Sequence, residues 1–307
     1  MLRPGLTGSP LDRAVQLRQD ADALAAAMGD WRARLLRLDG IDPVLGEDGG
    51  LSWGSLAEAD ESAELLLLGL QDGKPRFAAL DYAMPEGATR SMAIVRALEL
   101  LSPEEASTYA AARSLIDWHL RHRFCARCGS GDTTIYRAGW GRKCGQCGTE
   151  HFPRVDPVVI MLAEHDGRVL VGRQPRYPKG RYSALAGFVE PGESVEEAVA
   201  RELWEEAGLK VRDVAYVTSQ PWPFPSSLMM ACMAQADSAE LTIDTTELDD
   251  AFWVDRAGVA AALAGDSEPP FLPPPPYAIA HTLLSWWVNE PSPFRGEGDS
   301  ALRGRAG

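Results

Sequence analysis

Residues 187–209 hold the feature that most narrows the fold of this chain, a glycine-rich turn followed by an amphipathic stretch that is dense in glutamate. Gly208, just after the stretch, is a typical helix stop. The apolar positions before it recur every three or four residues and share one helix face: Val195, Ala198, Val199, Leu203 and Ala207. The pattern predicts a helix over residues 194–207 that packs on a sheet and turns another face to a cleft.

Three glutamates share that other face. At 3.6 residues per turn, Glu205 and Glu206 fall about 60° and 40° to either side of Glu202. Carboxylates placed this closely repel each other and raise one another's pKa, which is costly unless a cation lies among them. Hard divalent ions with oxygen ligands, Mg²⁺ or Mn²⁺, meet that need. A solvated acidic helix face is the alternative. It does not explain why four features occur together in one register: the glycine-rich turn, the apolar stripe, the arginine and the acids.

The whole segment resembles the Nudix box: a glycine, five residues, a glutamate, seven residues, and then Arg-Glu-Leu-Trp-Glu-Glu-Ala-Gly-Leu. The resemblance implies a fold of the α/β class, the Nudix α/β/α sandwich. It implies that Glu202, Glu205 and Glu206 are the catalytic, metal-binding residues, with Glu247 as a further ligand of Mg²⁺ or Mn²⁺. It also assigns a structural role to four positions of the box: Gly187, Glu193, Arg201 and Gly208.

Four of the five cysteines form two Cys-x-x-Cys pairs that are separated by fifteen residues: Cys125 with Cys128, and Cys144 with Cys147. This is the spacing of a four-cysteine zinc ribbon, and four thiolates leave no open position, so the Zn²⁺ is expected to be structural. A redox dithiol is the alternative, which two pairs at this spacing suit less well. Cys232 lies alone in an apolar stretch and is expected to be a buried small hydrophobe.

A proline-rich segment downstream of the box, Ser219-Gln-Pro-Trp-Pro-Phe-Pro-Ser-Ser227, narrows the family further. In isolation it would be interpreted as a surface linker; its prolines make it a rigid, non-helical loop. It resembles the S-Q-P-W-P-F-P-x-S signature of the NADH pyrophosphatases, the NudC-type branch. The resemblance implies substrate contacts at Phe188, which stacks on a base, at Phe152, which comes from the neighbouring subunit of a homodimer, and at nine further positions: Gln220, Pro221, Trp222, Pro223, Phe224, Pro225, Ser226, Ser227 and Ala280.

The chain is expected to divide into an N-terminal α+β domain over residues 1–120, the zinc ribbon over 121–152, the Nudix domain over 153–290 and a disordered tail over 291–307. Short strands and loops are predicted before residue 102. A capping box at Ser102 and Glu105 predicts a helix that runs to about residue 122. Beyond the ribbon, the pattern predicts a hairpin over 158–171 with its turn at Asp166-Gly167, strands over 214–219, 228–234 and 252–254, and a helix over 278–288.

The expected activity is metal-dependent hydrolysis of NADH or NAD⁺ to NMN(H) and AMP, with removal of NAD caps from RNA as a second activity of the same chemistry. Net charge is −14, which disfavours generic nucleic-acid binding, yet residues 113–154 carry eight Lys or Arg against three acids, a local balance of +5. A zinc ion bound by four thiolates would remove about two of these charges, and a solvated face of helix and ribbon is the alternative interpretation of the cluster. The alternatives are hydrolysis of another nucleoside diphosphate derivative and a non-catalytic nucleotide sensor, although a sensor would be expected to have lost box carboxylates. The chain lacks a membrane-length apolar segment, so a cytoplasmic protein is expected.

Overall fold

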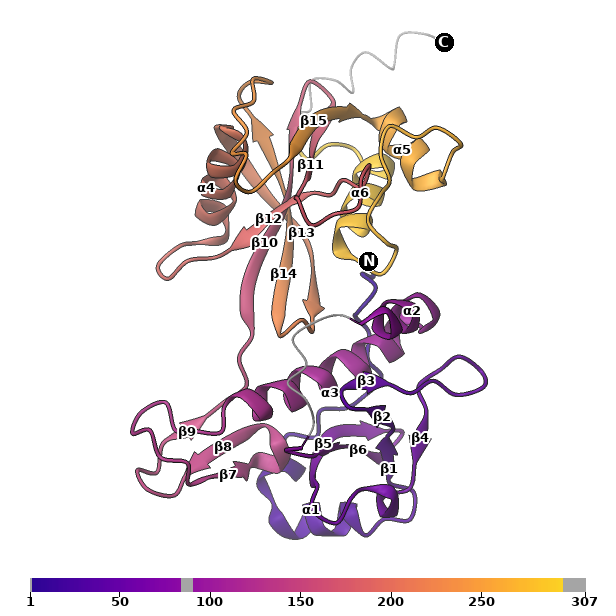
Figure 1. The fold of residues 1–307 in the computed structure, drawn as a ribbon, viewed down its shortest axis with the longest axis vertical. Helices are drawn as coiled ribbons and strands as arrows, with labels where there is room; N and C mark the ends of the chain where they lie inside the picture. The colour runs from indigo at the N-terminus through magenta and orange to yellow at the C-terminus, as the bar shows by residue number, and fades with distance from the viewer. Residues whose placement is uncertain (1, 84–90, 295–307) are drawn as a thin grey trace. The chain divides into compact units, whose positions relative to one another are not determined.

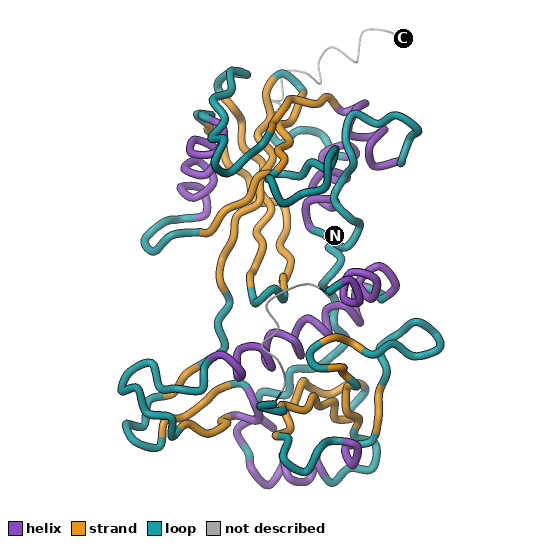
Figure 2. Tube along the Cα trace, in the orientation of Figure 1, coloured by secondary structure: helices purple, strands orange, loops and turns teal. Residues whose placement is uncertain are grey.

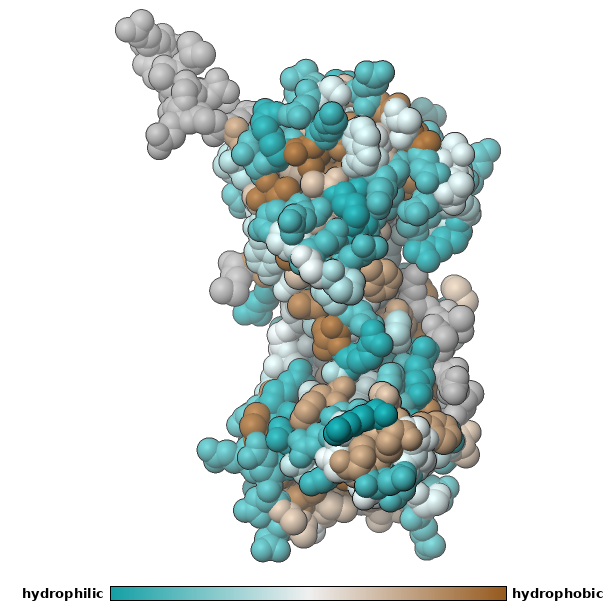
Figure 3. Space-filling view, turned by 90° about the vertical axis from the view of Figure 1, so that its left-hand side faces the viewer, coloured by the Kyte–Doolittle hydropathy of each residue, from teal (hydrophilic) through white to brown (hydrophobic). Residues whose placement is uncertain are grey.

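The computed structural model describes residues 2–83 and 91–294 of the chain, and its contacts divide them into two compact units (Figure 1). The C-terminal unit holds residues 2–5, 156–220 and 228–294, and the N-terminal unit holds residues 6–83, 91–155 and 221–227. No helix among these residues is both long and apolar enough to span a bilayer. On the face drawn in Figure 3, hydrophilic residues cover most of each unit, and hydrophobic residues form small groups among the hydrophilic ones.

The C-terminal unit is built on a six-stranded sheet in the order β13-β14-β10-β11-β15, with β12 paired to β10 beside this path. The strands are β10 (Asp156–His165), β11 (Arg168–Arg173), β12 (Leu185–Phe188), β13 (Val211–Trp222), β14 (Ser227–Ala236) and β15 (Asp250–Asp255). Asp166 and Gly167 turn β10 into β11 with φ angles of 47° and 71°, so the predicted hairpin is confirmed. The other predicted strands are confirmed as longer elements, and the proline-rich segment is the end of the β13–β14 hairpin.

Helices cover both faces of this sheet, which confirms the expected α/β/α sandwich (Figure 1). On one face α4 (Val195–Ala207) packs its buried stripe against β10 and β14 in one hydrophobic cluster. On the other face α5 (Arg256–Ala264) and α6 (Ile279–Asn289) enclose a second cluster around Trp287. The predicted closing helix is therefore confirmed. Helix α5 was not predicted, because its Ala-rich sequence has no strong apolar period; Asp255 caps it, and burial of Val259 and Ala262 holds it to the sheet.

The N-terminal unit contains a second, four-stranded sheet in the order β4-β1-β6-β5, as well as short helices on its edges (Figure 2). Its strands are β1 (Arg34–Leu36), β2 (Leu38–Asp39), β3 (Asp42–Pro43), β4 (Trp53–Gly54), β5 (Glu64–Gln71) and β6 (Lys74–Leu80). The predicted strands and the N-terminal α+β domain are confirmed. Two helices that the sequence analysis missed, α1 (Ala21–Met28) and α2 (Met92–Leu100), form here because Asp20 and Ser91 cap them with their side chains.

Helix α3 (Pro103–Arg121) confirms the helix predicted after Ser102, but its capping box is only half formed. The Ser102 hydroxyl oxygen accepts a hydrogen bond from the Glu105 backbone N–H at 3.2 Å. The Glu105 carboxylate does not return to the Ser102 backbone; it accepts from the Leu51 N–H at 2.8 Å instead. A tertiary contact with Leu51 therefore replaces the bond to the Ser102 backbone, while the Ser102 hydroxyl donates to the same carboxylate at 3.1 Å.

The ribbon follows α3 directly and is a three-stranded antiparallel sheet of β7 (Thr133–Tyr136), β8 (Gly141–Cys144) and β9 (Glu150–His151). At the other end of the chain, Ser292 is buried and Phe294 packs against the core of the C-terminal unit. The rest of the predicted disordered tail, residues 295–307, lies outside the described residues.

Candidate active site and metal centres

The two Cys-x-x-Cys turns of the ribbon bring four sulfurs to one point. The Sγ atoms of Cys125 and Cys147 are 3.6 Å apart and those of Cys128 and Cys144 are 3.7 Å apart, and all four lie within 4.8 Å of one another. A tetrahedral zinc with bonds of about 2.3 Å places its sulfurs about 3.8 Å apart, so the set fits Zn²⁺. No disulfide links them. His151 approaches from outside the set, with Nε2 3.2 Å from Cys125 Sγ.

In the C-terminal unit, a complete capping box positions the glutamates of α4. The Glu197 N–H donates to Ser194 Oγ at 3.2 Å, and the Ser194 N–H donates to the Glu197 carboxylate at 2.7 Å. At the other end Gly208 takes the left-handed conformation, with φ 69°, and its N–H caps the Trp204 carbonyl at 2.9 Å. The helix is therefore held rigidly at both ends, and so are the carboxylates on it.

Two of the three box carboxylates are buried and one is exposed. Glu206 is 2% exposed and Glu202 is 9% exposed, whereas Glu205 lies in solvent. Glu206 Oε2 has no hydrogen-bond partner among the residues that the structure describes. Burial raises the pKa of Glu206 to about 8, and the charges of Glu202, Glu247 and Glu205 raise it further in the same direction. Burial also raises the pKa of Glu202, against the opposing effect of Arg201.

Arg201 ties the helix to the glycine-rich turn. Its guanidinium donates to both oxygens of Glu193, at 2.6 and 3.0 Å, and to the Phe188 carbonyl at 2.9 Å. It also donates to Glu202 at 2.8 Å and to Glu205 at 2.9 Å. Hydrogen bonds to Arg201 hold the pKa of Glu193 at about 2. Among the described residues, Arg201 is thereby the one cation that pairs with Glu193, Glu202 and Glu205.

The glycine that opens the box allows a close approach. A Cβ atom added to Gly187 would lie 1.8 Å from the Glu202 carboxyl carbon. Any side chain at this position would displace Glu202, which explains physically why a glycine stands here. Strand β12, which carries Gly187, is thus in direct contact with the acidic face of α4.

Glu247 comes to the same region from a loop far along the chain. The Thr242 N–H donates to the Ala207 carbonyl at 2.9 Å, and the Asp244 N–H donates to the Glu206 carbonyl at 3.0 Å, so the loop is hydrogen-bonded to the end of α4. The Glu247 N–H closes a turn on Asp244 at 3.1 Å. The loop brings the Glu247 carboxylate close enough to raise the pKa of Glu206.

These acids fit a divalent cation on the chemistry of their donor atoms. All are carboxylate oxygens, the ligands that Mg²⁺ and Mn²⁺ prefer. One buried oxygen, Glu206 Oε2, lacks a partner among the described residues, and such an atom is costly unless a cation or donor satisfies it. Within residues 2–83 and 91–294, the ribbon sulfurs are the one compact group of metal ligands. The carboxylate oxygens of α4 lie farther apart, since Arg201 holds Glu202 and Glu205.

The tip of the proline-rich hairpin, residues 221–227, belongs to the N-terminal unit, where α3 holds it. Arg113 of α3 is 1% exposed and donates through Nε to the Pro223 carbonyl at 3.1 Å. Its guanidinium lies 4.9 Å from the centre of the Phe224 ring, and the Trp222 ring meets Phe224 edge to face at 5.2 Å. Ser114 Oγ donates to the Pro225 carbonyl at 3.3 Å.

Arg113 was missed by the sequence analysis. It also donates to the Ile41 carbonyl and the Tyr109 hydroxyl, at 3.2 and 3.1 Å, and forms a 3.4 Å ion pair with Asp42. From the sequence alone, an arginine among the alanines of α3 is expected to face solvent, because the distant acceptor is not known. Only the fold brings the Pro223 carbonyl to it.

The other predicted substrate residues are distributed between exposed and buried positions. Phe188 is 61% exposed on the C-terminal unit and Phe152 is 50% exposed on the N-terminal unit. Gln220 is fully buried and donates its amide N–H to the Tyr277 carbonyl at 3.2 Å, and Ala280 lies in the core around Trp287. Around the hairpin tip, Pro221 and Pro225 are exposed, Ser226 is half-buried, and Pro223 and Ser227 are buried.

Comparison with protein families finds three matches that together cover most of the chain. The NADH pyrophosphatase-like rudimentary NUDIX domain matches residues 32–118, the NADH pyrophosphatase zinc ribbon domain matches residues 120–152, and the NUDIX domain matches residues 153–273. The second match coincides with the four-sulfur cluster, and the third contains the acidic helix.

Individual relatives agree with these matches. The chain is 39% identical over 301 residues to the NAD-capped RNA hydrolase NudC of Mycobacterium bovis, an alignment that covers 93% of this chain and 95% of that protein. It is 41% identical to the NAD-capped RNA hydrolase NUDT12 of Homo sapiens over 266 residues, and to that of Macaca fascicularis over 270 residues. Those alignments cover 83% and 84% of this chain but 54% and 55% of the relatives, so the chain spans about half the length of the NUDT12 proteins.

Proposed function

This chain belongs to the Nudix hydrolase family, in the branch of the NADH pyrophosphatases and the NudC and NUDT12 hydrolases, and we propose that it hydrolyses the pyrophosphate bond of NADH or NAD⁺ to NMN(H) and AMP. The observation that carries the proposal is the unpartnered, buried Glu206 oxygen beside Glu202 and Glu247. A fold does not retain such a group for its stability, because a buried carboxyl without a partner is costly.

In this proposal Glu202, Glu205, Glu206 and Glu247 hold Mg²⁺ or Mn²⁺. When bound, the ion supplies positive charge that neutralises the pyrophosphate and acidity that activates water for attack on phosphorus. Arg201 and Glu193 have a positioning role, since their hydrogen bonds fix the turn at Phe188 to the helix that carries the acids. Gly187 leaves room for the Glu202 carboxylate, and Gly208 ends the helix so that the loop to Glu247 can return to it.

The dinucleotide is assigned to aromatic surfaces. Phe188 presents an exposed ring directly beside the box turn, and Trp222 and Phe224 form a rigid pair that Arg113 braces through Pro223. Such faces suit the nicotinamide and adenine rings. The remaining residues of the signature and Ala280 keep the substrate assignment that the family resemblance implies. The Zn²⁺ of the ribbon is assigned a structural role, because four thiolates leave it no open position.

A second activity is the removal of NAD caps from RNA, in which the same pyrophosphate bond is cleaved at the 5′ end of a chain. The NudC and NUDT12 relatives are named as NAD-capped RNA hydrolases. Residues 113–154 have a balance of +5, which a zinc ion bound by four thiolates lowers by about two, and this basic segment suits RNA phosphates.

We also propose that two copies of the chain assemble, with Phe152 of one copy serving the site of the other. The Phe152 ring is half exposed within its own unit, which leaves a face available to substrate. Sedimentation of the purified chain tests the assembly directly, and a monomer with full activity would contradict it.

The proposed hydrolysis is tested by product analysis with NADH and Mg²⁺ or Mn²⁺, comparing wild type with Glu206→Gln. Wild type should yield NMNH and AMP, and the variant should lose about a thousandfold or more in kcat. Glu196→Gln is the matched control, because Glu196 lies on the exposed side of the same helix. If wild type leaves NADH intact but cuts another dinucleotide, the substrate assignment is wrong; if it binds NADH tightly and cuts nothing, the chain is a nucleotide sensor.

A further inference from the structure

The C-terminal unit carries a run of positive charge to which the proposed site assigns no role. Residues 156–294 hold nine Lys or Arg against 21 Asp or Glu, a balance of −12. Five of the nine bases fall within residues 168–181, a stretch that contains no acid. Protein surfaces usually intersperse charges of both signs, and a segment of one sign attracts a ligand of the other. The segment is therefore a candidate site for an anion.

Three of these five cations lie in the loop that joins β11 to β12 (Figure 1). Arg173, at the end of β11, pairs with Asp249 at 2.9 Å. Among the described residues, by contrast, Arg176, Lys179 and Arg181 form no ion pair. Arg176 and Lys179 are exposed, whereas Arg181 is half-buried. The loop thus presents two uncompensated positive charges to solvent.

The fold uses other cations of the same unit. Arg201 pairs with glutamates of the Nudix box, and Arg212 pairs with Asp213 and Asp237. Arg256 donates to carbonyl groups at the end of α6. With 21 acids in residues 156–294, a base that serves stability has many possible partners. The two exposed loop cations are held away from all of them.

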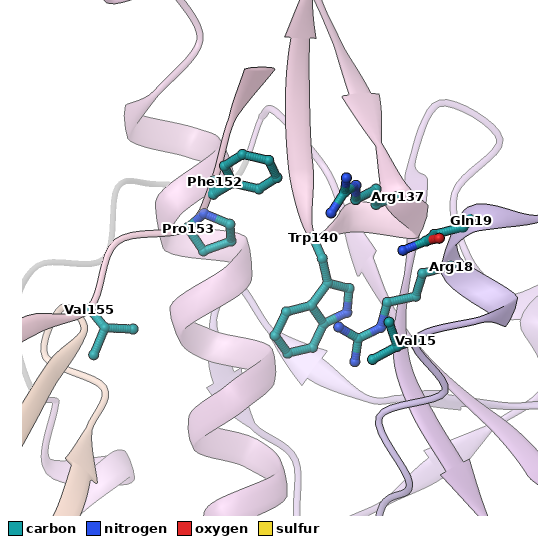
Figure 4. Close-up of a pocket in the computed structure, with 8 residues that line it drawn as sticks. All are labelled: Val15, Arg18, Gln19, Arg137, Trp140, Phe152, Pro153 and Val155. Carbon is teal, nitrogen blue, oxygen red and sulfur yellow. The ribbon is translucent and has the colours of Figure 1, made fainter.

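The unpaired arginines of the N-terminal unit differ, because aromatic rings hold them. In the pocket of about 310 Å³ drawn in Figure 4, the Arg18 guanidinium lies 3.7 Å from the centre of the Trp140 ring, and Arg137 lies 5.3 Å from that of Phe152. Both side chains have buried nitrogens. These arginines therefore support the unit and its proposed substrate residue Phe152, whereas the two loop cations are free to meet a ligand.

The loop is stiff although it is exposed. Over residues 174–181 the chain makes two consecutive turns, in each of which the N–H of the fourth residue donates to the carbonyl of the first, at 2.9 and 3.0 Å. Pro175 and Gly180, with φ 83°, occupy central positions that suit these residue types. Arg176 and Lys179 occupy the other central positions, at the corners of the turns. A stiff loop loses little conformational entropy when a ligand binds.

The base of the loop lies beside the elements that carry the acids. Gly172 and Ser183 exchange two backbone hydrogen bonds, at 2.9 and 3.0 Å, and so close the loop. The Asp249 N–H donates to the Arg173 carbonyl at 2.9 Å, and Asp249 follows Glu247 by two residues, a span of at most about 7 Å. At its other end the loop leads within two residues into β12, which contacts the acidic face of α4.

We propose that this loop binds phosphates of the RNA chain that follows the NAD cap, through the Arg176 guanidinium and the Lys179 ammonium group. The inference rests on the proposed removal of NAD caps, and it adds a surface that favours capped RNA over the free dinucleotide. Both groups bind phosphate oxygens, the guanidinium through its forked N–H groups and the ammonium as a point charge. The free dinucleotide offers only its pyrophosphate, which is assigned to the metal ion at the acids.

A second copy of the chain is the other occupant that charge complementarity allows, because the net charge of the chain is −14. RNA is favoured by two features together. It carries a negative charge at every nucleotide, and the proposed cleavage takes place at its 5′ end, beside the base of this loop. Self-association therefore becomes an outcome of the test.

The test compares wild type with Arg176→Ala/Lys179→Ala on two substrates, NADH and a single-stranded oligonucleotide with a 5′ NAD cap. We expect kcat/KM for NADH to stay within about twofold and kcat/KM for the capped RNA to fall about tenfold. The slope of log kcat/KM for RNA against log salt should become shallower by about 1.4, because two phosphate contacts are lost at about 0.7 each. The matched control is Lys210→Ala/Arg212→Ala, which removes the same charge from exposed positions of the same unit and should leave the slope unchanged.

Four results would overturn the proposal: an equal loss on both substrates, no loss on RNA, the same loss in the control, or a lower sedimentation mass of the loop variant, which would assign the surface to a second copy. If the alanine variant melts at a lower temperature than wild type, Arg176→Gln/Lys179→Gln takes its place. Failure of the hydrolase proposal is recognised separately, since wild type would then cut neither substrate. Fluorescence anisotropy with uncapped 5′-monophosphate RNA still tests the loop in that case, because wild type should bind it about tenfold more tightly than the loop variant.

Discussion

The two candidate metal sites of this chain balance their negative charge in opposite ways. In the ribbon, four sulfurs face one another at distances that match a tetrahedral zinc, and their own ligand set closes the site. On α4, Arg201 already pairs with Glu202 and Glu205, while Glu206 is buried with one oxygen unsatisfied. The closed set suits a metal that holds structure, and the incompletely satisfied set suits one that meets a substrate.

The largest expected effect is on the free energy of unfolding, which should depend strongly on the zinc site. Cys144→Ser should lose the zinc and destabilise the N-terminal unit by about 5 kcal/mol or more, because structural zinc contributes folding energy directly. Zinc content and urea unfolding measure the effect. Cys232→Ala is the control, because that thiol is buried in the core of the C-terminal unit and is not one of the four ribbon cysteines. A stable, zinc-free Cys144→Ser protein would contradict the structural role.

The affinity for Mn²⁺ should depend on the acids of α4 and not on the ribbon. Glu206→Gln is expected to weaken Mn²⁺ binding about a hundredfold, about 2.7 kcal/mol, while it leaves the zinc content and the unfolding free energy of the N-terminal unit unchanged. Mn²⁺ binding is followed by electron paramagnetic resonance of the free ion. Unchanged affinity would remove Glu206 from the ligand set, and simultaneous loss of zinc would show that the two sites are not independent.

Gly187→Ala tests whether the acidic site depends on close backbone approach. The added methyl would lie 1.8 Å from the Glu202 carboxyl carbon, so the carboxylate must move. We expect a loss of about tenfold to a hundredfold in kcat, about 1.4 to 2.7 kcal/mol, with little change in zinc content. Wild-type turnover in this variant would show that Glu202 is not needed at its present position.

Acid should lower the stability of the N-terminal unit through His119 of α3, which is fully buried. Its Nε2 lies 2.8 Å from the Gly139 carbonyl and its Nδ1 lies 3.1 Å from an N–H of Arg142, so the neutral ring donates to the first and accepts from the second. Burial lowers the pKa of His119 to about 4 from an ordinary value of 6.5. The contribution of the neutral ring to stability is therefore present above pH 6.5 and is lost as the pH falls toward 4.

The size of this loss is on the order of 2 kcal/mol, and it should be smaller in His119→Gln, which cannot take up the proton. Unfolding free energies of both proteins at pH 7 and pH 4.5 measure it, and the shared response of the zinc thiolates cancels in the comparison. Equal pH dependence in the two proteins would exclude His119 as the acid-sensitive group.

The smallest effect compares the two helix starts. Ser194→Ala breaks a reciprocal capping box. Ser102→Ala breaks a half-formed box and the bond from the Ser102 hydroxyl to the Glu105 carboxylate, which Leu51 continues to hold. We expect losses of about 1 kcal/mol for Ser194→Ala and less for Ser102→Ala, measured by thermal unfolding. The reverse order would mean that the tertiary bond of Glu105 depends on Ser102.

Short-range patterns predicted the elements that carry the chemistry. The period of the apolar residues placed α4, the Asp166-Gly167 turn placed the β10–β11 hairpin, and the cysteine spacing placed the ribbon. The helices α1, α2 and α5 were not predicted, because they are short; the side-chain caps at Asp20, Ser91 and Asp255 and the burial of one to three residues in each helix stabilise them.

What the sequence by itself determined is the set of local chemical groups: a run of acids on one helix face, two pairs of thiols and a proline-stiffened aromatic segment. Only the tertiary structure decided which distant groups meet them. It brought the loop of Glu247 to the end of α4, set Arg113 against Pro223, and placed the Arg13 and Arg18 guanidinium groups beside the Trp140 ring. The physical reason is range: periodicity and spacing govern contacts within a few residues, whereas burial and unpaired charge depend on segments that meet only when the chain folds.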